Sequence, residues 1–224
     1  LQRARGMPVA PALPAAVGGD VSFVTAYGVT DPYAQMRRHQ AVGPLESYAP
    51  APPPAQRRFY AYLSAEYRPL RQILNAIVGA RVPGKVYIKR ITPQLRQFLV
   101  ERGVEVLAAP PPLQQAVTEA SFVIHHGGRA TATAALGIGR PQMLWSSVAD
   151  QAVTTHAINQ LGVADITGLR YANGTDAAQG LQRLAADDGR MARAQAVAHQ
   201  LHQAGEGNSL GKIVAGARRL LAGG

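Results

Sequence analysis

The residues best suited to chemistry in this chain lie in one stretch, from Ile124 to Gln151. An apolar run ends at His125–His126, Gly127–Gly128 follow, and a helical pattern begins near Arg129. The two glycines allow a sharp turn and a close approach of the backbone to a ligand. A helix that begins there presents N–H groups without intrahelical acceptors and the positive end of its dipole. Because phosphate binds well at such a helix end, the stretch predicts an anion site.

The side chains around this turn fit the same chemistry. His126 can donate a hydrogen bond to a phosphate oxygen, Thr131 and Thr133 add hydroxyls in the first helical turns, and Arg129 adds a full charge. We expect His125, at the end of the strand, to be structural. A plain strand–helix turn explains two glycines before a helix equally well, so the residues alone leave that alternative open.

Composition excludes several classes of protein. The 224 residues include 47% apolar ones, enough for a substantial core. There is no cysteine, which excludes disulfides and thiolate metal sites. No run of about 18 apolar residues predicts a membrane span, and the Pro-rich start does not resemble a signal peptide. A cytoplasmic location is the expectation.

The charge of +10 is carried almost entirely by arginine, since lysine occurs only at Lys85, Lys89 and Lys212. No block of five like charges occurs, and the aromatic residues (6%) do not alternate with arginine as a base-stacking surface requires. We therefore predict no nucleic-acid binding. Attraction to an anionic membrane surface, and so a membrane-peripheral location, stays open.

After residue 57, short apolar runs alternate with segments of helical spacing. This alternation predicts right-handed βαβ crossovers and a Rossmann-like parallel sheet with helices on both faces, followed by a helical tail. Strands are expected at 58–63, 85–88, 104–107, 121–125, 142–145 and 163–166, with helices at 67–78, 92–101, 113–118, 129–136 and 150–161 and in the tail at 175–221. In such a sheet, ligands bind at the carboxyl ends of the strands.

The first part of the chain differs from the rest. Residues 1–48 contain one short apolar run, and residues 49–57 contain a proline cluster that cannot lie inside a helix. We expect 49–57 to be an extended linker, and 58–224 to form the main domain.

Several motifs in order resemble the carboxyl-terminal domain of GT-B glycosyltransferases of the family-1 type, which includes bacterial secondary-metabolite transferases and plant glucosyltransferases. The motifs are Ile124–Thr131, then Gly139–Gln142, then Asp150–Gln151. Gly43–Leu45 resembles the Gly-Pro-Leu that closes the amino-terminal domain of this family. The resemblance begins near residue 21, so residues 1–48 would be the end of an amino-terminal acceptor domain, and about 150 to 200 further residues of it are expected upstream.

The resemblance implies roles for particular residues. The residues for the donor diphosphate would be His126, Gly127, Gly128, Arg129, Thr131 and Ser64. Asp150 and Gln151 would bind hydroxyls of the donor sugar, and the backbone at Leu107 and Ala108 would pair with the base. No metal and no cofactor are implied, because the helix dipole and side chains would hold a UDP- or dTDP-sugar.

The chain departs from the family pattern at several places. Arg129–Ala130 replaces Ala-Gly, Ser64–Glu66 replaces the usual Gly-Ser or Gly-Thr, and Ser146–Ser147 replaces a Pro-aromatic pair. No aromatic residue lies in the expected base-stacking place, Ala109–Pro112. The choice between UDP and dTDP, and whether activity is retained, stay open.

The expected function is inverting transfer of a sugar to a hydroxyl of a natural product or lipid. The general base would lie in the missing amino-terminal domain, so no catalytic residue is expected in this chain. Two other classes stay open: a catalytically silent sugar-nucleotide-binding protein, and a basic module that docks on a membrane or acidic partner.

Overall fold

A computed structural model describes residues 21–36, 41–146, 148–166 and 174–222, without the side chains of Asp150 and Thr175. Six parallel strands form one sheet in the order β3-β2-β1-β4-β5-β6. The strands are β1 (Phe59–Ser64), β2 (Gly84–Lys89), β3 (Glu105–Val106), β4 (Phe122–His125), β5 (Gln142–Leu144) and β6 (Ala164–Asp165). The prediction of a Rossmann-like parallel sheet is confirmed.

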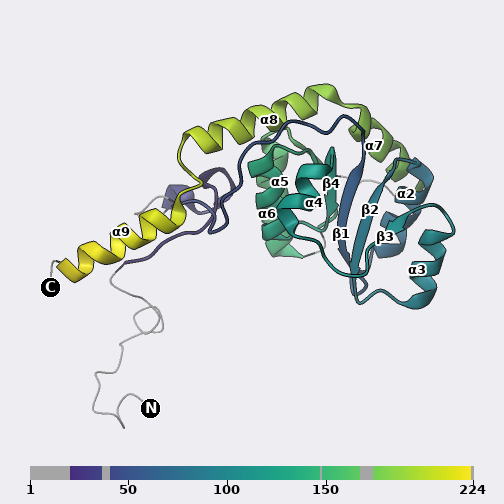
Figure 1. Cartoon of the computed structure of the whole chain (residues 1–224), viewed down its shortest axis with the longest axis horizontal. Helices are drawn as coiled ribbons and strands as arrows, with labels where there is room; N and C mark the ends of the chain where they lie inside the picture. Colours follow the sequence, from purple (N-terminus) through teal and green to yellow (C-terminus); the bar gives the residue numbers. More distant parts are fainter. Residues whose placement is uncertain (1–20, 37–40, 147, 167–173, 223–224) are drawn as a thin grey trace, which may run out of the picture.

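Helices cover both faces of this sheet (Figure 1). One face carries α2 (Leu70–Ala80), α3 (Pro93–Val100) and α7 (Gly174–Ala186), and α2 packs closely on α7. The other face carries α4 (Leu113–Glu119), α5 (Arg129–Ile138) and α6 (Ala149–Gln160). The helices predicted between the strands are all present. Gly103, with a φ of 76°, follows the end of α3, where glycine is common.

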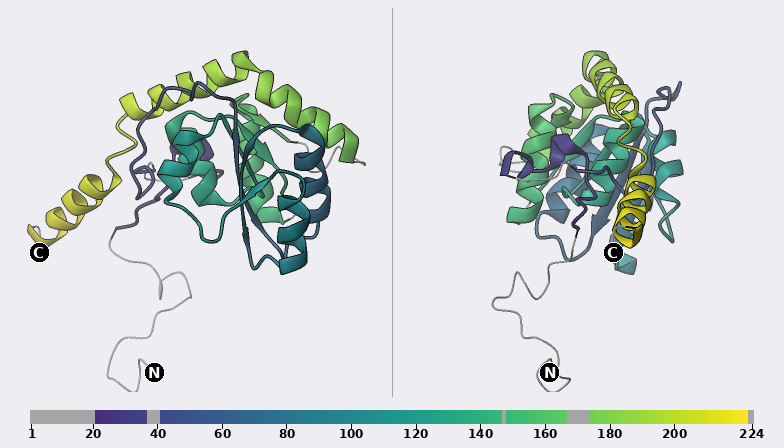
Figure 2. Two further views of the ribbon diagram at one scale, coloured as in Figure 1. Left: turned by 45° about the vertical axis from the view of Figure 1, so that its right-hand side comes forward. Right: turned by 90° about the vertical axis from the view of Figure 1, so that its left-hand side faces the viewer.

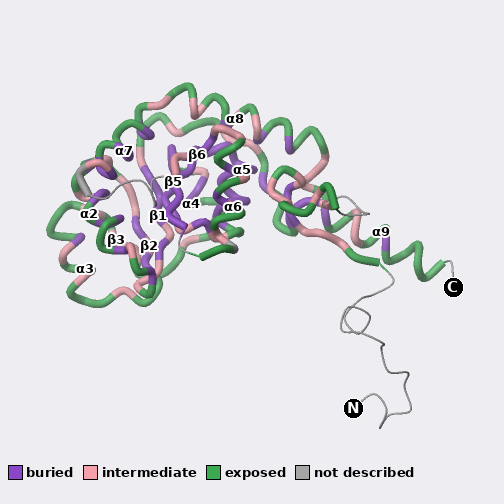
Figure 3. Tube along the Cα trace, turned by 180° about the vertical axis from the view of Figure 1, so that it is seen from behind, coloured by how far each residue is buried: buried purple, intermediate pink, exposed green. Residues whose placement is uncertain are grey.

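Strand residues alternate between the two faces, as the pleat requires. In β1, Phe59, Ala61 and Leu63 join the core beneath α2 and α7, whereas Tyr60 joins the core beneath α4 and α5. Figure 3 shows the strands as the buried centre of the molecule. Trp145 is 3% exposed in the first of these cores.

The Pro-rich segment predicted as a linker is extended and lies along the domain. The Ala51 N–H donates to the carbonyl of Ile138, at the end of α5. The fully buried Arg140 donates to the carbonyls of Ala51 and Pro52, and also to that of Thr118 in α4. A buried arginine thus fastens the segment to the ends of two helices.

The helical tail continues through α8 (Asp188–Gln203) to α9 (Ser209–Ala222) (Figure 2). Helix α8 packs on α5, and α9 lies beside the first described residues, away from the sheet. Glu206, between these two helices, accepts the Gly28 N–H at the start of the short helix η2 (Gly28–Thr30); η3 (Ala34–Met36) follows. Among the described residues, no helix is long and apolar enough to cross a membrane.

Candidate functional site

The chain leaves β1 in one direction and returns to its other side at β4, so the sheet has its switch point between these strands. In open parallel sheets, the crevice at the carboxyl ends beside such a point is the usual ligand site. Ser64 ends β1 and His125 ends β4. The predicted phosphate-binding loop therefore lies where the topology alone would place a ligand.

His125 is buried and supports the loop from within. Its Nε2 lies 2.9 Å from Oε1 of Gln142 on β5, and its Nδ1 accepts the Gly127 N–H at 3.2 Å. Complete burial lowers the pKa of His125 to about 4, so the ring is neutral near pH 7. The Gly127 contact requires an unprotonated Nδ1, which puts the ring proton on Nε2. The prediction that His125 is structural agrees with this geometry.

Gly127 makes the turn that no other residue fits. Its φ is 85°, in the left-handed region. A Cβ at this position would lie 2.9 Å from Oγ1 of Thr155 and 3.2 Å from the backbone oxygen of Gln151. The loop after β4 therefore packs directly against α6, which fixes the start of α5.

Helix α5 begins at Arg129 with an open end. Its N-cap is Gly128, and no side chain caps the first turn. The N–H groups of this turn consequently have no intrahelical acceptor and point out of the helix with its positive dipole end. Arg129 and Ala130 are exposed there, whereas Thr131 is buried at 6% exposure. The residues of this loop that were predicted to bind the donor diphosphate thus lie together around one helix end.

His126 is half-buried beside that end and is oriented by two neighbours. Its Nδ1 lies 3.2 Å from Nε2 of Gln151, and its ring lies against Tyr67, with 5.8 Å between centroids. Because an amide nitrogen can only donate, Nδ1 accepts and the proton resides on Nε2. Burial lowers the pKa of His126, which favours this neutral form. The ring is left with one N–H donor for a ligand.

The residues predicted for the sugar lie on α6. Gln151 is committed to orienting His126, a role that its sequence position did not reveal. Asp150 lies in the first turn of α6, but its side chain falls outside the described residues. A cavity of about 410 Å³ lies between α5, α6 and the segment 24–33, and Arg129, Thr133 and Thr154 are among its lining residues.

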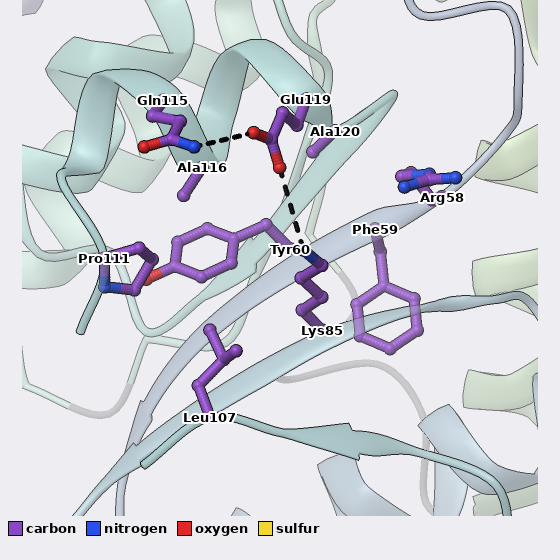
Figure 4. A pocket seen from close by; sticks show the side chains of 10 residues that line it. All are labelled: Arg58, Phe59, Tyr60, Lys85, Leu107, Pro111, Gln115, Ala116, Glu119 and Ala120. Atoms are coloured by element: carbon purple, nitrogen blue, oxygen red, sulfur yellow. Dashed lines mark hydrogen bonds and ion pairs between the residues drawn. The ribbon is translucent and has the colours of Figure 1, made fainter. Parts of the chain in front are cut away.

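The predicted base-binding segment follows β3. The Leu107 N–H donates to the carbonyl of Val86, and its own carbonyl accepts from Arg96. The Leu107 side chain points with those of Tyr60 and Pro111 into a cavity of about 80 Å³ under α4 (Figure 4). The exposed backbone of Ala108 forms no hydrogen bond within the described part of the chain. Of the two predicted residues, Ala108 has the backbone groups free for a base.

Within the described ranges, no cluster of three or more histidine, aspartate or glutamate residues could hold a metal ion. No family model and no curated protein matches the sequence.

Solved structures do match. The glycosyltransferase VinC, in complex with dTDP, has a TM-score of 0.69 at 19% identity, over 93% of this chain and 55% of VinC. The fold is that of the carboxyl-terminal half of a GT-B glycosyltransferase. The glycosyltransferase of kitacinnamycin matches with a TM-score of 0.70 at 18% identity, over 95% of this chain and 58% of its own length. LpCGTa, in complex with UDP, matches with a TM-score of 0.66 at 13% identity, over 86% of this chain and 54% of its own. This chain thus spans a little over half the length of these enzymes.

Proposed function

We propose that this chain is the donor-binding half of an inverting glycosyltransferase that uses a UDP- or dTDP-sugar. The observation that carries the proposal is the uncapped N-terminus of α5, placed with His126 at the switch point of a sheet that has the GT-B fold. Backbone N–H groups and a helix dipole suit a diphosphate.

In this proposal the site acts on the leaving group. The bond between the sugar and the diphosphate breaks, and negative charge develops on the departing phosphate oxygen. The fixed N–H groups of α5, the Nε2–H of His126 and the charge of Arg129 stabilise that charge without reorganising. The cavity beside α5 and α6 gives room for the sugar or its acceptor.

Attack by an acceptor hydroxyl also needs a general base. His126 does not suit that task, because its Nδ1 is held by Gln151 and its Nε2 carries the proton. We propose that the base and most of the acceptor pocket belong to a second domain facing this edge. The acceptor would be a natural product or a lipid, and a lipid acceptor would bring the basic surface to a membrane.

Calorimetric titration with UDP and dTDP tests the donor site. We expect binding, and we expect His126→Ala to weaken it between about tenfold and a hundredfold, the range for losing a hydrogen bond to a charged group. His156→Ala, which removes an exposed histidine of α6, is the matched control and should change nothing. If neither UDP nor dTDP binds, the proposal is contradicted.

A further inference from the structure

An exposed ion pair lies at the carboxyl edge of the sheet, between Glu66 and Arg90. Ser64 and Lys89 are register partners at the ends of β1 and β2, and the Ala65 N–H donates to the Lys89 carbonyl at 2.9 Å. The Glu66 N–H then donates to Oγ of Ser64 at 3.4 Å. The turn after β1 therefore places Glu66 at the carboxyl ends of the neighbouring strands β1 and β2.

Stability does not explain this pair. The two side chains are 64% and 67% exposed, and ion pairs at such positions contribute little to folding. Arg90 also has a φ of 59°, in the left-handed region that an arginine adopts only at a cost. Backbone strain of this kind gathers at functional sites.

The strand order places the pair between the two ends of a bound nucleotide. The diphosphate would lie at the end of β4 and the base at Ala108, after β3, with β1 and β2 between them. Strands β3 and β4 are about 14 Å apart, which is three strand spacings of about 4.8 Å. Because the ribose joins the base to the diphosphate, it must pass over the ends of β1 and β2, where Glu66 and Arg90 lie.

Resting on the proposed function, we propose that Glu66 accepts hydrogen bonds from the 2′ and 3′ hydroxyls of the donor ribose. A carboxylate has two acceptor oxygens and no donor, which suits a vicinal diol. Arg90 holds the carboxylate in place and offsets its repulsion of the diphosphate. Of the two donors that the proposed function allows, the site therefore favours the UDP-sugar, because dTDP lacks the 2′ hydroxyl.

Titration with UDP and 2′-deoxy-UDP, which differ in one hydroxyl, tests this directly. We expect the wild-type chain to bind UDP between about tenfold and a hundredfold more tightly. In Glu66→Ala the ratio should fall close to one, mainly through weaker binding of UDP. Glu101→Ala is the matched control, because Glu101 is also exposed and paired with an arginine, Arg102, but lies at the end of α3. That variant should keep the wild-type ratio.

The outcomes separate this inference from the proposed function. Equal binding of the two nucleotides by the wild-type chain would overturn the role of Glu66 and leave the donor site standing, and so would an unchanged ratio in Glu66→Ala. Failure of both nucleotides to bind would overturn the donor site and this inference together. A melting temperature of Glu66→Ala equal to that of the wild type checks that the variant is folded.

Discussion

His125 connects three elements through one neutral ring: β4, the Gly127 turn and Gln142 on β5. Gln142 also lies 3.4 Å from the carbonyl of Ala132, through its Nε2, so the same chain of contacts reaches α5. The sequence predicts a structural role for His125 and a phosphate contact for His126. Burial separates them, since His125 is 1% exposed and His126 is half-buried.

This arrangement predicts a loss of stability in acid. The pKa of His125 is lowered from 6.5 to about 4, so the unfolded chain takes up this proton more readily than the folded one. The neutral ring contributes fully to the free energy of unfolding above about pH 6.5. This contribution, about 3 kcal/mol in all, is lost as the pH falls towards 4. Urea unfolding at pH 7.5 and pH 4.5 measures it.

The variant His125→Asn isolates this effect, because an amide oxygen can still accept the Gly127 N–H but does not titrate. It should be less stable than the wild type at pH 7.5, with a smaller loss on acidification. His156→Asn, at an exposed position, should keep the wild-type pH dependence. An equal acid loss in His125→Asn would show that other groups cause it.

At the scale of elements, Arg140 connects the Pro-rich segment to the domain through hydrogen bonds. No acidic residue in the described part of the chain pairs with it. Its guanidinium donates to five backbone carbonyls, those of Ala51, Pro52, Thr118, Ile138 and Gly139. Several of these carbonyls lie at the carboxyl ends of α4 and α5, where the helix dipoles are negative. Burial alone lowers the pKa of this group to about 10, so it stays charged near pH 7.

Replacing Arg140 by leucine should destabilise the chain by about 2 to 4 kcal/mol, because buried carbonyls lose their donor. The first amide to lose protection in hydrogen exchange should be that of Ala51, which donates to the Ile138 carbonyl. Arg102→Leu is the control, since Arg102 also donates to a carbonyl but is exposed. Retained protection at Ala51 in Arg140→Leu would contradict the fastening role.

Much of the fold was predictable because the strands after residue 57 are short apolar runs bounded by turn residues, and the helices keep apolar spacing. The loop after β4 was predictable for a local reason, since glycines and a helix start are adjacent in sequence. Contacts between residues that are distant in the sequence were not predictable. Arg140 occupies a motif position without any local sign of burial, and the hydrogen bonds that engage Leu107 depend on Val86 and Arg96. Glu66 and Arg90 meet only because β1 and β2 are neighbours.

At the scale of the whole molecule, the two ends of the described chain lie together, away from the sheet (Figure 1). Glu206 accepts the Gly28 N–H, and a Cβ at Gly216 on α9 would lie 2.5 Å from Cζ of Phe23. The short helix η2 of this junction packs on α6, and a cavity between residues 24–33 and the start of α5 includes Arg129. With a charge of +10, the chain as a whole also attracts an anionic nucleotide.

Nuclear magnetic resonance of the imidazole nitrogens during titration with UDP tests the central claim most directly. Of the six histidines, His126 should show a neutral ring with its proton on Nε2, and the Nε2 signal should shift as UDP binds. His125 should keep its signals apart from small changes, and His156 should not respond. Binding of UDP without any change at His126 would contradict the placement of the diphosphate at the start of α5.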